Sequence, residues 1–286
     1  MSERRKLFNY FTRQELAVGN VSFDDLFLIA IEKSLNKKGA DRDKYYDANV
    51  KRIWNYVIKQ QSDDQKNQSI QPIFHILNSI TRDVQCYLKE RFNYTGDNRF
   101  QLLQSRPFIL NEIDLLNDRQ YEALPILLCQ LLGAKDVHLT PAGNEAGIDF
   151  IATMKYSDES DYLFGVNGPI RIIGQCKKYS TPVQVNTIKE FESTMIDVFH
   201  LTAKMRRILP TWFYEAKGVI VGWVISHSGF QQGAKDRGKE FGYVLTDSRD
   251  IAEIIAASQK FYPSIVHNQR QDNLKHDLLK ILTLFK

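Results

Sequence analysis

The segments GNEAGIDFIA at residues 143–152 and GQCKKY at residues 174–179 decide the fold of this chain. The first is a glycine-containing turn that leads into the apolar run IDFIATMK, and the second ends the apolar run PIRIIGQCKKY. Short apolar runs bounded by turn residues indicate β-strands. The two segments therefore predict neighbouring strands at residues 148–155 and 169–179.

The polar residues of these two strands fall into a pattern. Side chains alternate along a strand, so Gln175 and Lys177 point to one face while Cys176 points the opposite way, into the core. If the two strands pair as a hairpin, Asp149 can face Gln175 and Lys177 across the ladder. The sequence thus predicts one acid, one amide and one amine close together.

Helices and strands alternate on both sides of this pair. The order from residue 118 on is α-β-β-β-α-β-α-β-α, which predicts an α/β domain with a mixed central sheet flanked by helices. The expected helices are 118–132, 184–206, 230–240 and 250–261, and the expected strands are 137–139, 148–155, 169–179, 218–226 and 243–247.

Residues 1–110 predict a mainly helical N-terminal domain. Ser22 and Asp25 precede or begin an apolar run in the manner of a helix N-cap. Further helices are expected at residues 47–59 and 70–91, with the polar run QQSDDQKNQS as a loop between them. The segment Thr95 to Asn111 lacks periodicity and is the candidate boundary.

Charge leaves the role of this N-terminal domain open. Residues 1–110 carry 18 Lys and Arg against 13 Asp and Glu, whereas the remainder carries 20 against 21. A mildly basic helical segment is compatible with a winged-helix or helix-turn-helix reader of DNA. A sensing, oligomerisation or protein-binding domain is an equal alternative, because no recognition-helix signature is evident.

The tail, residues 266–286, predicts a C-terminal amphipathic helix. Its apolar residues lie on one face, and they are Leu274, Leu278, Ile281 and Phe285. Such a helix packs on its own domain more often than it binds a partner.

Composition predicts a soluble, cytoplasmic protein without a membrane segment. Of its 286 residues, 43% are hydrophobic and 25% are charged, and its net charge is +4. No apolar run approaches the ~20 residues that span a bilayer. The three cysteines, Cys86, Cys129 and Cys176, form no CxxC pair, which argues against a disulfide framework or a cysteine-based zinc site.

The chain resembles the Mrr-like catalytic domain of the PD-(D/E)xK nuclease superfamily over residues 118–258. The segments that carry the resemblance are YEALPILLCQLLGA, GNEAGIDFIA, GQCKKY, GVIVGWVISHSGFQQGAK and DSRDIAEII. The resemblance implies a restriction-endonuclease-like fold and a division into residues 1–110, 111–265 and 266–286. Gln175 stands where many superfamily members have Glu, as is common among Mrr-like domains.

The resemblance also implies a metal-dependent active site. Mg²⁺ or Mn²⁺ prefers oxygen ligands, neutralises phosphate charge and activates water. The expected ligands are the Asp149 carboxylate, the Gln175 side-chain oxygen and the backbone carbonyl of Cys176. Lys177 is expected to orient or help deprotonate the attacking water. One carboxylate beside an amide suggests one tightly held ion.

Two more carboxylates are candidate ligands. Glu122 lies early in the helix at 118–132, where the resemblance places a Glu beside the metal, although a solvated first-turn carboxylate would look the same. Glu145 precedes the Gly-Ile-Asp element, where Asp would be more usual, and it could instead be a turn residue. His227 could act as a general base, but we expect it to be a loop residue without a catalytic role.

The function implied is a metal-dependent endonuclease that hydrolyses DNA phosphodiester bonds in restriction or antiphage defence. The expected partners are DNA, a second copy of the chain and a defence-system protein. Two alternatives stay open, namely a signal-gated nonspecific nuclease and a catalytically inactive nucleic-acid-binding module. Cleavage of RNA is also compatible with the motif, because the chemistry takes place at phosphate.

Overall fold

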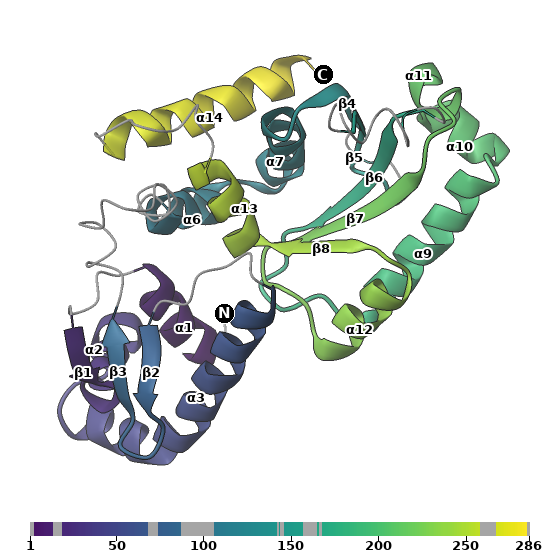
Figure 1. The fold of residues 1–286 in the computed structure, drawn as a ribbon. Helices are drawn as coiled ribbons and strands as arrows, with labels where there is room; N and C mark the ends of the chain where they lie inside the picture. Colours follow the sequence, from purple (N-terminus) through teal and green to yellow (C-terminus); the bar gives the residue numbers. More distant parts are fainter. Residues whose placement is uncertain are drawn as a thin grey trace. The chain divides into compact units, whose positions relative to one another are not determined.

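A computed structural model describes residues 3–13, 19–67, 74–86, 106–141, 143, 146–156, 165, 168–257 and 267–284. The chain divides into two compact units, which are Met1–Asn111 with Ala256–Pro263, and Glu112–Ile255 with Ser264–Lys286. Each unit is described below by itself (Figure 1). Within the described residues, no helix combines the length and apolar character that crossing a membrane requires.

The first unit consists of helices packed beside a small sheet. Its elements in chain order are α1 (Glu3–Arg13), β1 (Gly19–Ser22), α2 (Phe23–Leu35), α3 (Ala40–Asn67), β2 (Phe74–Asn78) and β3 (Asp83–Cys86). The strands pair antiparallel in the order β1-β3-β2. Helices α2 and α3 follow one another along the chain and pack together, and α2 also contacts β1.

Local signals explain where α2 and α3 begin and end. The Ser22 hydroxyl accepts a hydrogen bond from the Asp24 amide at 3.2 Å, so the predicted N-cap is confirmed. Asn36 ends α2 in the left-handed conformation at φ 59°, which Asn tolerates better than most residues. The run at 60–69, expected to be a loop, is helical as far as Asn67.

The prediction of a helix at residues 70–91 is wrong for residues 74–86, the part of this range that the structure describes. Residues 74–86 form the hairpin of β2 and β3, while 70–73 and 87–91 lie outside the described residues. The Asn78 side-chain oxygen accepts hydrogen bonds from the amides of Ile80 and Thr81. These bonds stabilise the turn that connects β2 to β3. Ile80, which falls within the expected helix, is 90% exposed at the turn. The spacing of apolar residues was therefore compatible with a helix that the turn does not permit.

The second unit contains a five-stranded mixed sheet. Its strands are β4 (Ala134–Leu139), β5 (Phe150–Met154), β6 (Ile170–Lys177), β7 (Ile220–Ser226) and β8 (Val244–Asp247). They lie in the order β4-β5-β6-β7-β8, antiparallel from β4 to β6 and parallel from β6 to β8. The predicted fold class and the predicted succession of these strands along the chain are confirmed.

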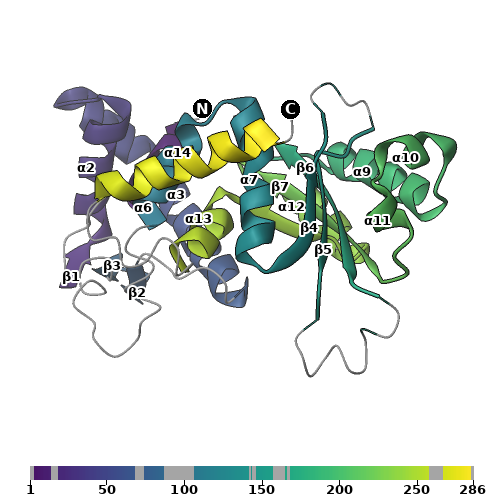
Figure 2. The same ribbon diagram turned by 90° about the horizontal axis from the view of Figure 1, so that it is seen from above.

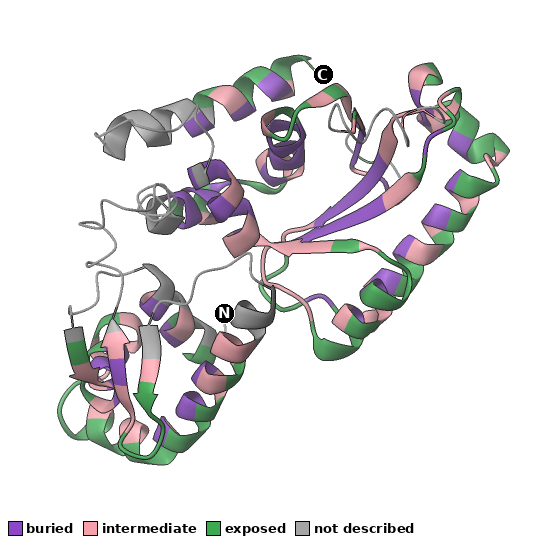
Figure 3. Ribbon diagram, in the orientation of Figure 1, coloured by how far each residue is buried: buried purple, intermediate pink, exposed green. Residues whose placement is uncertain are grey.

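Helices cover both faces of this sheet (Figures 1 and 2). The helices of the unit are α6 (Arg106–Leu115, which begins in the first unit), α7 (Asp118–Leu131), α9 (Val185–Phe199), α10 (Ala203–Ile208), α11 (Thr211–Tyr214), α12 (Gln232–Glu240), α13 (Ser248–Ala257) and α14 (His267–Leu284). α7 lies on one face and α9 with α12 on the other, and α7 is buried along most of its length (Figure 3).

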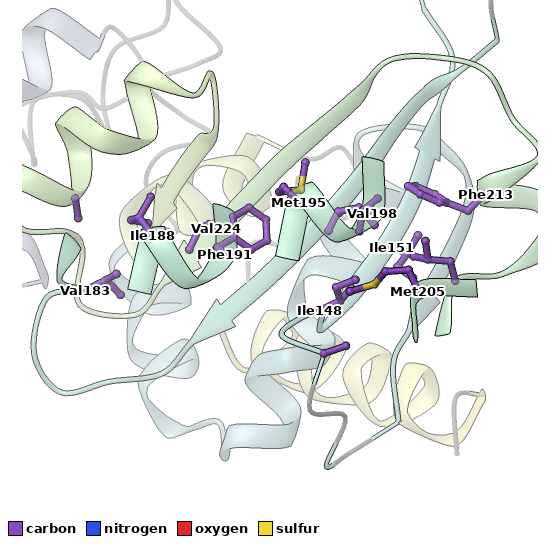
Figure 4. Packing of buried hydrophobic residues seen from close by; sticks show 14 residues of the cluster. Ile148, Ile151, Val183, Ile188, Phe191, Met195, Val198, Met205, Phe213 and Val224 are labelled. Carbon is purple, nitrogen blue, oxygen red and sulfur yellow. The ribbon is translucent and has the colours of Figure 1, made fainter. Parts of the chain in front are cut away.

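The face under α9 has a continuous apolar core. Ile151 and Ile173 from paired strands pack with Phe191 and Met195 from α9 and Val224 from β7 (Figure 4). All five side chains are buried. Burial of this size makes the sheet a rigid base for residues at the ends of its strands.

Two predictions about helices can be compared with the structure: the single helix at 184–206, and the choice of the tail helix between its own domain and a partner. The expected helix 184–206 is broken, because Leu201 has φ 45° and Thr202 caps a new helix, α10. The tail helix α14 packs on α7 and buries Leu274, Leu278 and Ile281, so it covers its own unit. Phe285 lies outside the described residues.

Gly174 in β6 is required by a neighbouring aromatic ring. A Cβ placed there would lie 1.9 Å from the Phe150 ring, which packs edge-on against Trp223. We expect Gly174→Ala to lower the free energy of unfolding by about 1–3 kcal/mol through overpacking, as measured by urea denaturation.

A matched substitution isolates this effect. A Cβ at Gly233 in α12 would make an ordinary contact with Val185 Cβ at 3.9 Å, and the backbone there is helical. Gly233→Ala should therefore be neutral or stabilising by about 0.5–1 kcal/mol. Equal losses in both variants would show that the Phe150 contact is not the cause.

Candidate active site

The pairing of β5 and β6 places Asp149 beside the carboxyl-terminal half of β6. Phe150 is paired with Gly174, and the Asp149 amide donates to the Gly174 carbonyl at 2.9 Å. The Asp149 Oδ2 atom accepts a hydrogen bond from the Cys176 amide at 2.6 Å. The acid is thus fixed at the end of its strand by the backbone of its neighbour.

Burial makes the Asp149 carboxylate costly to ionise. Desolvation raises its pKa from 3.8 to about 6, against the lowering effects of the Cys176 amide, the Lys177 ammonium and the Arg119 guanidinium. The Glu122 carboxylate raises the pKa further. Lys177, Glu122 and Arg119 are therefore close enough to interact electrostatically with Asp149.

Gln175 has a buried oxygen that lacks a partner. Its side chain is 6% exposed, and its Nε2 atom donates to the Gly147 carbonyl at 3.0 Å. This bond orients the amide, while the Oε1 atom has no hydrogen-bond partner within the described part of the chain. A buried acceptor without a donor is unfavourable, but it suits a cation that prefers oxygen ligands.

Gly147 and Thr194 shape the other side of this amide. Gly147 has φ +72°, and a Cβ there would lie 2.9 Å from Thr194 Oγ1 and 3.3 Å from Gln175 Nε2. Thr194, on α9, donates to the Ala146 carbonyl at 3.2 Å. The helix thereby holds the turn that precedes Asp149, and a larger residue at 147 would displace Gln175.

Lys177 is the last residue of β6 and Lys178 follows it, and their ammonium groups have different neighbours. The Lys177 carbonyl accepts the His227 amide at 2.9 Å, and its ammonium lies 5.9 Å from the centre of the Tyr179 ring. The Lys178 ammonium instead donates to the Leu116 carbonyl. Only Lys177 of the two contributes to the electrostatics of Asp149, which agrees with the alternation predicted from sequence.

Cys176 contributes through its backbone amide rather than its thiol. The thiol is buried, and burial raises its pKa well above the ordinary value, with Asp149 and Glu122 adding to the effect. A buried protonated thiol is a packing group and not a nucleophile.

Glu122 lies on α7 and is tied to Arg119, one turn earlier. Glu122 Oε2 accepts from Arg119 at 2.9 Å, and the guanidinium also donates to the Thr140 carbonyl at 3.0 Å. α7 begins with a capping box between Asn117 and Gln120, which fixes its first turn. Glu122 is near Asp149, whereas Glu145 lies outside the described residues.

Four residues make contacts in the site that were not predicted from the sequence, namely Arg119, Thr140, Gly147 and Thr194. Arg119 had one local signal, since an Arg three residues before a Glu on a helix favours an ion pair. The others act through backbone carbonyls or conformation, which a motif does not reveal.

His227 packs among neighbouring side chains after the end of β7. Its Nε2 atom lies 2.8 Å from Asp114 Oδ1, its ring packs edge-on against Tyr121, and its side chain is 11% exposed. It joins the end of β7 to α6 and α7, in keeping with a structural role.

The donor set around Asp149 consists of oxygen atoms. Among the described residues, no three His, Cys, Asp or Glu side chains converge to hold a metal. The available donors are the Asp149 carboxylate, the unpartnered Gln175 oxygen and, nearby, Glu122. Such donors fit one hard divalent cation better than a zinc ion.

Residues 113–255, half of the chain, match the Mrr_cat family model, which is described as restriction endonuclease. No protein in the curated set matches the chain. Two solved structures are similar, namely the MspJI restriction endonuclease in complex with a 27-mer oligonucleotide (14% identity, TM-score 0.38) and the DNA modification-dependent restriction endonuclease AspBHI (15%, 0.39). The matches cover 69% and 68% of this chain and only 38% and 42% of those proteins.

A buried Asp149 should make stability depend on pH. The native pKa is raised, so the wild-type protein loses stability as pH rises from 3.8 to about 6, and the penalty is complete above that range. Asn does not titrate and can still accept the Cys176 amide. Asp149→Asn should therefore be more stable than wild type by about 1–3 kcal/mol at pH 8 without metal.

This prediction is measured by chemical denaturation between pH 4 and pH 8 in EDTA. The difference should shrink towards zero near pH 4. Asp236→Asn, on the exposed surface of α12, is the control and should show no such trend. A less stable Asp149→Asn protein at pH 8 would contradict the electrostatic interpretation.

Proposed function

The chain belongs to the restriction endonuclease family, and from this membership we propose that it hydrolyses DNA phosphodiester bonds with the help of Mg²⁺ or Mn²⁺. The observation that supports metal dependence is the buried Gln175 oxygen, which has no partner among the described residues, beside a carboxylate whose pKa burial raises to about 6. Both groups are unfavourable alone, and a divalent cation would relieve both.

Asp149 and Gln175 would hold the ion through a carboxylate and an amide oxygen, with the Cys176 carbonyl, Glu122 and Glu145 as further proposed donors. Bound there, the cation supplies positive charge to the phosphate oxygens and makes water a stronger nucleophile. The buried backbone of β5 and β6 keeps the donors oriented before substrate arrives.

Lys177 is the proposed proton-handling residue. Its ammonium is near Asp149 and can donate hydrogen bonds to the attacking water or to a phosphate oxygen. A fixed cation at that point stabilises the negative charge that develops in the transition state.

The experiment is cleavage of supercoiled plasmid by the full chain in Mg²⁺, Mn²⁺ or EDTA. We expect nicking or linearisation with metal only, reduced at least ~100-fold in Asp149→Ala and Lys177→Ala, because each removes a group that acts in the transition state. Lys178→Ala, which changes the neighbouring lysine whose ammonium donates to the Leu116 carbonyl, should retain activity.

The products separate the alternatives. Cleavage in EDTA, or full activity in Asp149→Ala, would contradict the proposal. DNA binding without cleavage by the wild type would favour an inactive binding module. Linear product formed in a single encounter would support the proposed action of two copies, since each chain offers one such site. A role in restriction or antiphage defence, with a partner protein, is proposed from the family alone.

We propose further that the first unit binds DNA through α3. The side chains of Lys51, Arg52, Asn55 and Lys59 are exposed along one face of this helix. In a helix-turn-helix the second helix enters the major groove, and these residue types bind phosphates and base edges. The acidic residues of α3 lie near its two ends, at positions 41, 43 and 47 and at positions 63 and 64. The stretch between them, residues 48–62, carries three positive charges and no acid.

Salt dependence tests this surface. The double substitution Lys51→Gln with Lys59→Gln should weaken binding to a DNA duplex in EDTA and reduce the slope of log affinity against log salt by about 2, one for each lost phosphate contact. Lys6→Gln with Lys33→Gln removes the same charge from exposed positions on α1 and α2 and should leave the slope unchanged. Identical slopes in both variants would reject α3 as the DNA surface and favour a sensing or oligomerisation role.

A further inference from the structure

Arg119 connects the Glu122 carboxylate to the backbone of Asp149 through a chain of hydrogen bonds. One guanidinium nitrogen donates to Glu122 Oε2 at 2.9 Å, and the other donates to the Thr140 carbonyl at 3.0 Å. The Thr140 amide and hydroxyl both donate to the Asp149 carbonyl at 3.0 Å. The path therefore runs from α7 to the start of β5.

The path is rigid at both ends. α7 is fixed by its capping box, and Thr140 is 2% exposed with its hydroxyl also donating to the Ile148 carbonyl at 2.6 Å. Asp149 is held on its other side by the Cys176 amide. Arg119 is the side chain that joins these two fixed parts, and its planar fork suits two acceptors at once.

The contact also decides which Glu122 oxygen is available. Arg119 engages Oε2, which leaves Oε1 for a ligand. The Arg119–Glu122 pair is about one-third exposed, and an exposed ion pair of this kind contributes little to stability. The ion pair matters for geometry, because a carboxylate already held in one rotamer loses no further conformational entropy when it binds a cation.

We infer that Arg119 is a positioning residue. It holds the Glu122 carboxylate in a fixed orientation relative to Asp149 and so strengthens binding of the divalent cation. The inference rests on the proposed function, in which both carboxylates face the ion. Arg119 acts through Glu122 and Thr140 and need not touch DNA.

The direction in which cation affinity changes when Arg119 is replaced distinguishes a positioning role from a purely electrostatic one. If Arg119 contributed only its positive charge, its removal would strengthen the binding of another cation. If it positions Glu122, its removal weakens that binding, by about 10–100-fold for partners of metal ligands. Lys keeps the charge but lacks the fork, so Arg119→Lys should also weaken binding.

The experiment is titration of the full chain with Mn²⁺ by calorimetry, without DNA. We expect Arg119→Gln and Arg119→Lys to weaken Mn²⁺ affinity at least ~10-fold. The control is Arg237→Gln, which breaks an Arg–Glu pair of the same spacing on α12 and should leave the affinity unchanged. Circular dichroism confirms that each variant is folded.

A double-mutant cycle tests the route through Glu122. Arg119→Gln should have little further effect on Mn²⁺ affinity in a Glu122→Gln background, because the group that it positions is already changed. Additive effects, or unchanged or tighter Mn²⁺ binding in Arg119→Gln, would overturn the inference while leaving the nuclease proposal intact. Absence of Mn²⁺ binding by the wild type would overturn both.

Discussion

The hydrogen bond from the Cys176 amide to the Asp149 carboxylate is the interaction on which the candidate site depends. It joins the start of β5 to the end of β6, and it exists only because the two strands are paired in the register of Phe150 with Gly174. The register in turn requires a glycine, since any side chain at 174 would occupy the space of the Phe150 ring. A packing constraint on one face of the sheet thus determines the position of an acid.

The cost of this arrangement is electrostatic. Burial raises the pKa of Asp149 to about 6, and the buried Gln175 oxygen finds no partner in the part of the chain that the structure describes. Natural structures tolerate such groups mainly where function requires them. The apolar core under α9 supplies the stability that offsets them, and it also keeps Gly147, Gln175 and Thr194 in contact.

The position of β6 in the sheet explains why the site is where it is. β6 pairs antiparallel with β5 and parallel with β7, so its carboxyl end lies beside the start of β5 and the end of β7. Asp149 comes from the first neighbour, and the His227 amide that binds the Lys177 carbonyl follows the second. A strand that links the two kinds of pairing therefore gathers residues far apart in sequence.

The sequence by itself determined the second unit closely. Alternation placed Gln175 and Lys177 on one face and Cys176 on the other, and the order of strands and helices predicted the mixed sheet, because local periodicity reports which face is buried. It failed at residues 74–86, where apolar spacing suited a helix and a turn at Asn78 produced a hairpin. Only the tertiary structure decided that Arg119 joins α7 to Thr140 and that Gln175 keeps an oxygen without a partner. Those features depend on distances between side chains and backbone carbonyls brought together by folding, for which spacing along the chain carries no information.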